Sequence, residues 1–294
     1  MSANPKIWLE AARPKTLPAA VMPVMVGTAL ASVHHATDFT RAAICLVFAL
    51  LVQIGTNFAN DYYDFVQGAD TAARVGPRRA VAAGLVTPRQ MLIATWLVLG
   101  VAFAVGLLLV RECGWVLLPV GVISIVCAIA YTGGPFPLGY YGLGEVFVFI
   151  FFGLVAVTGT FYVQAGSVSA AAWWMSVPVG LIITAILVVN NLRDLENDCQ
   201  AGKHTLAVRL GIRGTRMEYM SCMAIAYLLL PALVILNIVP MFSLLAWLSI
   251  PFAWKTMRVV FTQEGRPLNA ALAGTGQIAL VYSVLFWVGI SLAK

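Results

Sequence analysis

Nine long apolar stretches constrain the fold of this chain more than any other feature of its sequence. The hydrocarbon core of a membrane is about 30 Å thick, so a helix that crosses it needs roughly 20 mostly apolar residues. The stretches that qualify lie at approximately residues 17–33, 42–64, 90–110, 114–132, 143–163, 171–193, 217–237, 240–260 and 270–292. Because apolar and polar residues do not alternate within them, these stretches are typical of helices rather than of barrel strands. The sequence therefore predicts an all-α fold, a polytopic membrane helical bundle of about nine transmembrane helices.

The composition excludes a soluble protein. Of the 294 residues, 61% are hydrophobic and only 10% are charged, whereas soluble domains carry about 25% charged residues. The same composition excludes intrinsic disorder. Five cysteines without a close pair offer neither a zinc site nor a disulfide framework. We expect residues 1–294 to form one intramembrane domain.

The distribution of lysine and arginine predicts how the bundle lies in its membrane. With the N-terminus inside, fifteen of the eighteen basic residues fall in cytoplasmic segments, and only Arg41, Arg111 and Lys294 fall outside. The chain is therefore expected to be N-in and C-out. This asymmetry explains the formal net charge of +6 without a nucleic-acid partner, and some of the cations are expected to meet anionic membrane lipids.

Two polar motifs, at residues 57–89 and 190–216, contain six of the twelve acidic residues near their entrances. In the first motif Asn60 and Asp64 are four residues apart, and Asn57 and Asp61 repeat that spacing beside them. Residues four apart share a face of a helix. Each motif runs from the end of an apolar stretch into a basic loop, so the two motifs look like one device used twice.

The second motif is more regular, since Asn190, Asp194 and Asp198 step by four twice. Carboxylates this close to a membrane are costly and by default mark a function. Their mutual repulsion would be relieved by Mg²⁺, which takes one or two carboxylates per ion and completes its coordination with water and phosphate oxygens. The predicted metal ligands are Asn60, Asp64, Asn190, Asp194 and Asp198.

Basic residues beside the motifs are expected to hold phosphate oxygens. They are Arg74, Arg79, Arg193 and Lys203. A diphosphate at the mouth of an apolar cavity suits an amphiphile whose tail lies among the helices, and a polyprenyl diphosphate is such a molecule. Metal and cations would stabilise the charge that grows on the leaving diphosphate, and apolar walls would keep water from the resulting allylic cation.

Five blocks of the sequence carry a family resemblance. They are Arg13-Pro14-Lys15-Thr16-Leu17, Ala59-Asn60-Asp61-Tyr62-Tyr63-Asp64-Phe65, Arg74-x-Gly76-Pro77-x-Arg79, Tyr131-Thr132-Gly133-Gly134-Pro135, and Asn190-Asn191-Leu192-Arg193-Asp194 with the following Gly202-Lys203-x-Thr205. In these blocks the chain resembles the UbiA superfamily of intramembrane aromatic prenyltransferases. Within that superfamily it is most similar to the branch that prenylates 1,4-dihydroxy-2-naphthoate in menaquinone biosynthesis.

The resemblance implies a nine-helix bundle and Mg²⁺-dependent transfer of a polyprenyl group to 1,4-dihydroxy-2-naphthoate. Carbon dioxide and diphosphate are lost, and demethylmenaquinone is formed. The catalytic candidates are Asp61, Asp64 and Asp194, and a site carboxylate, Asp61 or Asp64, could serve as the base that activates the acceptor. Tyr131 is a candidate aromatic neighbour of the cation or the ring, and Asn57 is a further candidate for the site.

One departure from the family pattern concerns Asp70. Many members of the superfamily carry an aspartate four residues after the position of Asp64, where this chain has Gly68. Glycine has no side chain to bind a metal, so Asp70 would replace that ligand only if the helix has ended and the chain turns back.

Two alternatives stay open from the sequence. The acceptor could be another aromatic or lipid molecule, or the paired Asn and Asp positions could be the coupling site of a cation-driven secondary transporter. The depth of the site in the membrane distinguishes a transporter from an enzyme, because transport sites lie near the middle of the membrane and these motifs lie at helix ends. The family role implies a bacterial or archaeal plasma membrane, with the active site facing the cytoplasm.

Overall fold

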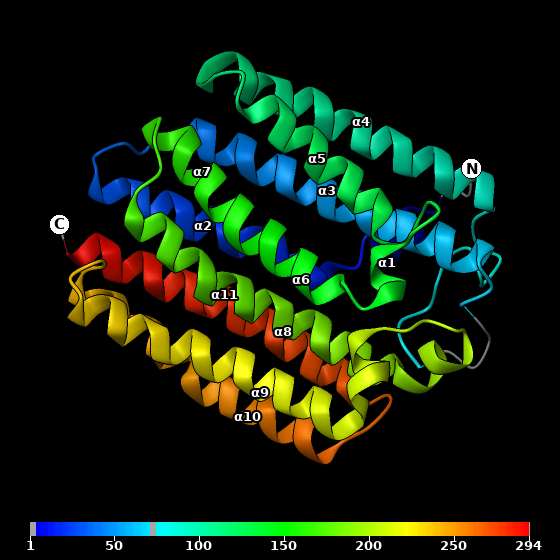
Figure 1. Cartoon of the computed structure of the whole chain (residues 1–294). Helices are drawn as coiled ribbons and strands as arrows, with labels where there is room; N and C mark the ends of the chain where they lie inside the picture. The colour runs from blue at the N-terminus through cyan, green and yellow to red at the C-terminus, as the bar shows by residue number, and fades with distance from the viewer. Residues whose placement is uncertain (1–3, 71–74, 294) are drawn as a thin grey trace.

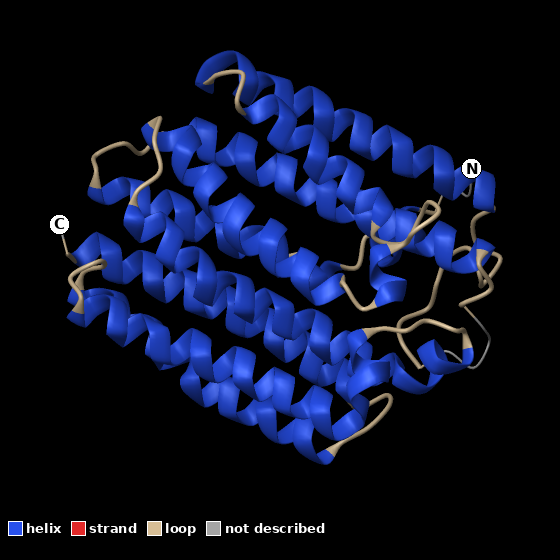
Figure 2. Ribbon diagram, in the orientation of Figure 1, coloured by secondary structure: helices blue, strands red, loops and turns tan. Residues whose placement is uncertain are grey.

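The computed structural model describes residues 4–70 and 75–293, and this part of the chain contains helices and loops but no strand (Figure 2). The elements are α1 (Pro5–Ala11), η1 (Pro14–Thr16), α2 (Pro18–Val33), α3 (Phe39–Val66), α4 (Pro88–Cys113), α5 (Leu117–Ala130), η2 (Leu138–Tyr141), α6 (Gly144–Val148), η3 (Phe149–Val155), α7 (Ala156–Ala165), α8 (Ala170–Gln200), α9 (Leu206–Ile235), η4 (Met241–Ser249), α10 (Ile250–Thr262) and α11 (Leu268–Leu292). The predicted all-α fold is confirmed.

Seven helical segments of the described chain are long and apolar enough to cross a membrane. The N-terminal segment adds an eighth crossing if Pro5–Thr16 and Pro18–Val33, which bend by 54° at their junction, count as one span. The remaining predicted span, 114–132, corresponds to α5, whose 14 residues rise only about 21 Å at 1.5 Å per residue. A membrane-integral bundle is therefore confirmed, and the number of nine crossings stays a prediction.

Helix α8 is the central element of the bundle. It packs against α9, α11, α2, α7 and the segment formed by α6 and η3. In its most apolar window 72% of the residues are buried, against 28% to 50% in the other single-helix spans. Because α8 is enclosed on nearly every side, Asn191, Arg193 and Asp194 near its end are held inside the protein rather than at its outer surface.

Small residues allow α8 and η3 to approach closely. A Cβ atom at Gly153 of η3 would lie 2.7 Å from Gly180 Cα and 2.8 Å from the carbonyl oxygen of Ser176, both on α8. Real Cβ atoms do not make contacts this short, so only glycine fits. The π-helical turn of η3 lies at this contact, and wide turns of this kind are often found at functional sites.

The two polar motifs are brought to the same end of the bundle. In Figure 1 the loops that follow α3 and α8 lie on the right with α1, and α11 ends on the left. The capping box of Thr87 and Gln90 starts α4 at this end, and Thr205 caps the start of α9. This arrangement is the one expected if the N-terminal end and both motifs face the cytoplasm, and that orientation stays a prediction.

Filling the contact between η3 and α8 should destabilise the bundle. We expect Gly153→Val to lower the free energy of unfolding by about 1 to 3 kcal/mol, because the added side chain overpacks against the α8 backbone. Thermal unfolding of the detergent-solubilised protein, followed by circular dichroism, measures the change. Gly100→Ala is the matched control, because a Cβ there meets nothing within 4 Å and alanine favours helix. Equal melting temperatures for the two variants would contradict the close contact.

Candidate active site

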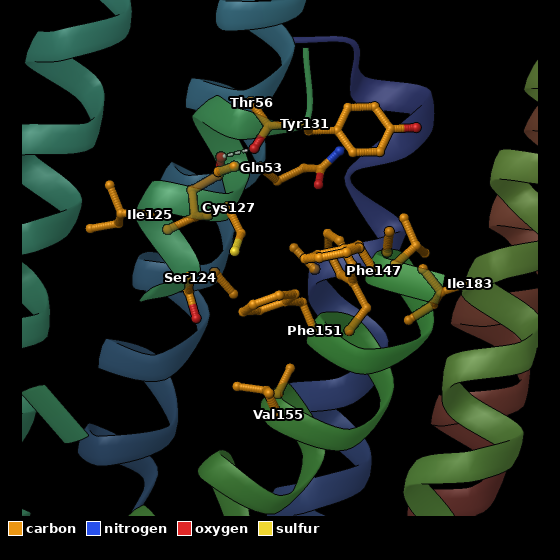
Figure 3. Close-up of a pocket in the computed structure, with 18 of the residues that line it drawn as sticks. Gln53, Thr56, Ser124, Ile125, Cys127, Tyr131, Phe147, Phe151, Val155 and Ile183 are labelled. Carbon is orange, nitrogen blue, oxygen red and sulfur yellow. Dashed lines mark hydrogen bonds between the residues drawn. The ribbon is translucent and has the colours of Figure 1, made fainter. Parts of the chain in front are cut away.

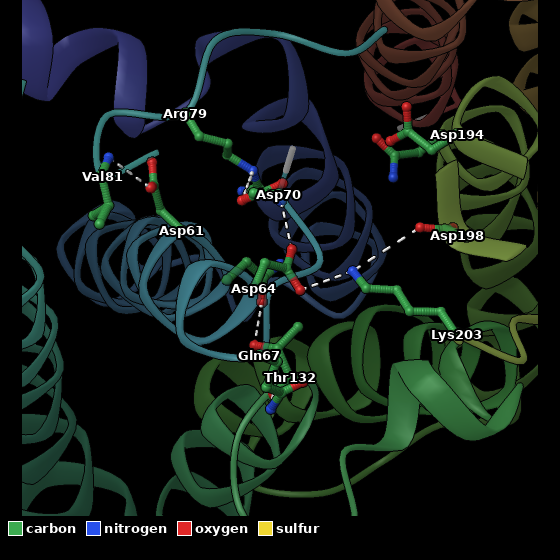
Figure 4. Close-up of polar contacts among 12 residues, drawn as sticks. Asp61, Asp64, Gln67, Asp70, Arg79, Val81, Thr132, Asp194, Asp198 and Lys203 are labelled. Atoms are coloured by element: carbon green, nitrogen blue, oxygen red, sulfur yellow. Dashed lines mark hydrogen bonds and ion pairs between the residues drawn. The ribbon is translucent and has the colours of Figure 1, made fainter. Parts of the chain in front are cut away.

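Asp64 lies at the centre of the polar end of the bundle. It is 2% exposed and stands in the last turn of α3. Its Oδ2 accepts a hydrogen bond from Arg79 Nη2 at 2.7 Å, and its Oδ1 accepts from the Tyr140 hydroxyl at 2.9 Å and from Lys203 Nζ at 2.8 Å (Figure 4). Two cations and a phenol thus surround one buried carboxylate, which fixes its position and offsets its charge.

Lys203 connects the two motifs. Its Nζ lies 2.8 Å from Asp64 Oδ1 on α3 and 4.0 Å from Asp198 Oδ1 on α8 (Figure 4). It also lies 4.5 Å from the centre of the Tyr140 ring, within cation–π range. Burial, and next the neighbouring Asp64 carboxylate, raise the pKa of the Tyr140 phenol, so this hydroxyl keeps its proton and donates a hydrogen bond to Asp64.

Both motif helices end in the same way. After α3 the N–H of Ala69 bonds to the carbonyl of Asp64 at 2.8 Å, and after α8 the N–H of Lys203 bonds to the carbonyl of Asp198 at 2.8 Å. These are the long bonds of the Schellman motif, and each is made possible by a glycine at φ +71°, Gly68 or Gly202. The last acid on each helix, Asp64 on α3 and Asp198 on α8, is therefore held at the point where its chain turns back.

This turn accounts for the departure noted at Gly68. Glycine is needed there because the residue adopts a left-handed conformation, and the helix has ended at Val66. The chain then turns back and places Asp70 with its Oδ2 3.2 Å from Arg79 Nε. Asp70 and Asp64 thus contact two different nitrogens of the Arg79 guanidinium, and Asp70 reaches the site through Arg79.

Asp61 lies beside this cluster but does not reach the cavity. Its Oδ2 accepts from the N–H of Ala80 at 2.9 Å and its Oδ1 from the N–H of Val81 at 3.1 Å (Figure 4). Since the carboxylate is 2% exposed and engages two backbone amides, it anchors the loop that carries Arg79. Asp61 is predicted from the sequence to be catalytic, and in the structure it positions the loop that carries Arg79.

In the second motif Arg193 is the organising residue. Its Nε and Nη2 bind the two oxygens of Asp194 at 2.9 and 2.6 Å, and Nη2 also donates to Asn190 Oδ1 at 2.9 Å. Its Nη1 donates to Asn269 Oδ1 at 3.0 Å, at the start of α11. A Cβ at Gly76 would lie 2.8 Å from Arg193 Nη2, so the loop of the first motif passes directly over this guanidinium.

The amides of the first motif face the cavity. Asn60 Oδ1 accepts from the Thr132 hydroxyl at 2.7 Å, and Asn57 Nδ2 donates to the carbonyl of Ala12 at 2.9 Å and to Thr16 Oγ1 at 3.3 Å. These bonds tie α3 to the segment after α5 and to the break before α2. The prediction for Arg74 falls outside the described residues.

One elongated cavity begins at this polar end and continues between the apolar faces of the helices. Its polar wall contains Arg13, Asn57, Asn60, Asp64, Arg79, Asn190, Asn191, Asp194, Asp198 and Lys203. Its apolar wall includes Phe48, Leu109, Leu117, Phe147, Phe151 and Val155. Figure 3 shows Phe147, Phe151 and Val155 in this wall. Along α3 the lining runs from Asn60 to Cys45, a distance of about 22 Å. The cavity therefore fits a molecule with a charged head and a long apolar tail.

The donor set fits Mg²⁺ held together with a substrate. Among the described residues no group of three His, Cys, Asp or Glu side chains is placed to bind a metal on its own. The site instead offers separate carboxylates and amide oxygens on two helix ends, with the Lys203 ammonium between Asp64 and Asp198. Mg²⁺ is usually bound through one or two carboxylates and completed by phosphate oxygens, which is the arrangement these residues allow.

Some residues of the site were not found from the sequence. Asn269 was missed because it lies near the start of the last apolar stretch, far from both motifs, and only the folded chain brings it to Arg193. Glu145 was also missed, although an acid two residues into the predicted span 143–163 is a signal in itself. Arg13 and Thr132 were quoted only as parts of sequence blocks, and the cavity brings both to its polar end.

Comparison with known proteins assigns the chain to a family. It belongs to the UbiA prenyltransferase family, which it matches over residues 20–280. It is 40% identical to a 1,4-dihydroxy-2-naphthoate octaprenyltransferase of Mycobacterium tuberculosis over 94% of each chain. The enzyme of the same name from Escherichia coli is 38% identical, with 98% of this chain and 96% of the relative covered. The family resemblance found in the sequence is confirmed.

A solved structure shares the fold. The structure of a UbiA homolog from Archaeoglobus fulgidus bound to DMAPP and Mg²⁺ superposes with a TM-score of 0.67, covering 97% of this chain and 99% of that one at 14% identity. At this identity the likeness shows the fold alone. The helical arrangement that surrounds the cavity is therefore the arrangement of this family.

We expect Asp61→Asn to loosen the loop that carries Arg79. An amide can accept only one of the two backbone hydrogen bonds and turns an N–H group toward the other, so the amides of Ala80 and Val81 should exchange about tenfold faster or more. Hydrogen–deuterium exchange read by mass spectrometry over residues 79–86 measures the effect. Glu196→Gln, an exposed carboxylate on α8, is the control. Unchanged exchange in the Asp61 variant would remove its anchoring role.

Proposed function

We propose that this protein transfers a polyprenyl group from polyprenyl diphosphate to 1,4-dihydroxy-2-naphthoate in menaquinone biosynthesis. The observation that carries the proposal is the cavity, which joins paired carboxylates and cations at one end to a long apolar chamber. The relatives that bear the name of this activity are 32% to 40% identical over nearly the whole chain, which supports the same acceptor here.

The donor would bind with its diphosphate at the polar end. Arg79 and Lys203 each bind Asp64, and both line the cavity, so they can turn toward phosphate oxygens. Arg193 fixes Asp194 and Asn190 from behind. The prenyl tail would extend along the apolar chamber, whose length of about 22 Å accommodates several isoprene units.

Magnesium would be held by Asp64 and Asn60 from α3 and by Asn190, Asp194 and Asp198 from α8. When bound, it would supply charge neutralisation of the diphosphate as that group leaves. Asp61 and Asp70 would support this site indirectly, Asp61 by anchoring the loop of Arg79 and Asp70 by holding its guanidinium. Structures of UbiA homologues bound to prenyl diphosphates and Mg²⁺ agree with this use of the fold.

In the reaction the bond between C1 of the prenyl chain and the diphosphate oxygen breaks, and the diphosphate keeps the electron pair. Lys203 and Arg79 are placed to stabilise that charge. The allylic carbon then bonds to the carboxylate-bearing ring carbon of the acceptor. Carbon dioxide leaves, and its bonding electrons restore the aromatic ring as a prenylated naphthoquinol, the reduced form of demethylmenaquinone. Phe147 and Phe151 would shield the cation from water.

The position of the site favours a transferase over a transporter. Coupling sites of secondary transporters lie near the middle of the membrane between broken helices. Here Asp64 and Asp198 occupy the last turns of two helices and are tied to a cation from a loop. The asymmetry of basic residues supports a plasma-membrane protein with this end of the bundle toward the cytoplasm.

Removing the central carboxylates should abolish turnover. We expect Asp64→Ala and Asp194→Ala to lose at least about 100-fold in kcat, because each removes a proposed metal ligand and leaves buried cations without their partner. The assay gives the purified protein Mg²⁺, polyprenyl diphosphate and 1,4-dihydroxy-2-naphthoate, and measures prenylated product, diphosphate and carbon dioxide.

Asp64→Asn serves as a second variant if Asp64→Ala fails to fold, because the amide keeps the shape of the side chain. Glu196→Gln is again the matched control on α8 and should retain full activity. Normal turnover in a folded Asp64→Asn or Asp194→Ala protein would rule out the proposed site. Turnover with another aromatic acceptor but not with the naphthoate would correct the acceptor alone.

Chelation should inhibit the enzyme reversibly. Because the proposed ion would share its coordination between protein oxygens and the diphosphate, it should exchange readily, and excess EDTA should reduce product formation at least about 100-fold. Adding Mg²⁺ in excess of the chelator should restore the rate. Undiminished product formation in EDTA would overturn the metal assignment.

A further inference from the structure

A buried carboxyl group lies beside the first residues of the second motif. Glu145, the second residue of α6, is 5% exposed, and its Oε1 accepts a hydrogen bond from Asn191 Nδ2 at 2.8 Å. Within the described part of the chain its Oε2 has no hydrogen-bond partner. Burying a carboxyl group of which only one oxygen is hydrogen-bonded costs free energy. The contact between Glu145 and Asn191 is therefore expected to have a role beyond packing.

Asn191 brings this contact to the cavity wall. Unlike Glu145, Asn191 lines the cavity. Because Glu145 Oε1 accepts from the N–H₂ group of the Asn191 amide, the carbonyl oxygen of the same amide is left for a different partner. Among the residues that the structure describes, nothing hydrogen-bonds to that oxygen. The neighbouring Asn190 differs, because its carbonyl oxygen is already engaged by Arg193.

The surroundings of Asn191 suit a flat aromatic ring. Tyr131 and Phe147 line the same cavity, and Figure 3 shows both rings in it. A Cβ at Gly144 would lie 3.0 Å from the Tyr131 hydroxyl, which places that phenol against the residue next to Glu145. Asn191 follows Asn190 on α8 and lies seven residues, a rise of about 10 Å, before Asp198, so this subsite adjoins the inner side of the diphosphate site.

Resting on the proposed transferase function, we propose that Asn191 binds the aromatic acceptor by accepting a hydrogen bond from a ring hydroxyl, and that Glu145 is the positioning residue that fixes the Asn191 amide. The ligand class is a phenolic aromatic ring, held between Tyr131 and Phe147. Glu145 itself does not touch the acceptor, since it does not line the cavity.

Separate kinetics for the two substrates test this proposal. We expect Asn191→Ala and Glu145→Leu to raise the KM for 1,4-dihydroxy-2-naphthoate about tenfold, the usual effect of one lost hydrogen bond, with the KM for polyprenyl diphosphate within about twofold of wild type. Glu145→Gln keeps an oxygen that accepts from Asn191, so it should restore the KM for the acceptor to within about threefold. Quenching of the protein's own fluorescence by the naphthoate, measured without polyprenyl diphosphate or Mg²⁺, should rank the wild type and these variants in the same order of affinity for the acceptor.

Thr184→Val is the matched control. Thr184 is a buried polar residue of α8 that does not line the cavity, and its hydroxyl has no hydrogen-bond partner in the described chain. This variant should leave both KM values unchanged. If Glu145 only ties α6 to α8, Glu145→Leu would lower the melting temperature and the active fraction while leaving both KM values as they are, and the proposal would be wrong.

The binding measurement separates the two proposals. If the wild-type protein shows no turnover with the naphthoate, the proposed function fails, and the quenching titration still compares wild type with Asn191→Ala. Equal affinity in those two proteins, with or without turnover, would overturn the acceptor subsite. Weaker binding by Asn191→Ala together with rescue in Glu145→Gln would support it.

Discussion

The structure depends on how the Asp64 carboxylate is stabilised inside a membrane protein. A lone buried carboxylate is strongly unfavourable, and removing one partner of a buried ion pair typically costs about 3 to 5 kcal/mol. Asp64 is acceptable because Arg79 and Lys203 approach it from two different loops and Tyr140 donates a third hydrogen bond. Since these three partners come from separate segments, this one interaction also sets the relative positions of the loops that form the mouth of the cavity.

The backbone prepares this arrangement before any ligand binds. Both helices end within one turn of their last acid, Asp64 or Asp198, and the left-handed glycines Gly68 and Gly202 reverse the chain. The reversal after α8 sends Lys203 back over Asp198 toward Asp64, which explains how a residue from the loop can serve both acids. Preorganised charges of this kind stabilise a leaving group without reorganising during the reaction.

Much of this could be predicted from the sequence because the signals are local. Apolar length predicted helices that cross a membrane, and the four-residue spacing of Asn60 and Asp64 predicted a shared face, which the cavity lining bears out. The role of Asp61 could not be predicted in the same way, because its partners are backbone amides of a loop whose path has no periodic pattern. Asn269 was beyond reach for a related reason, since its contact with Arg193 depends on how the last helix packs.

The crossing of Gly76 over Arg193 has a consequence for how this protein can evolve. A methyl group on the first loop would collide with a guanidinium of the second motif, 2.8 Å from Nη2. A bulkier residue at position 76 would therefore require the Arg193 guanidinium to shift away from its hydrogen bonds with Asp194 and Asn190. The two halves of the molecule, despite their separate helices, are obliged to diverge as a single unit.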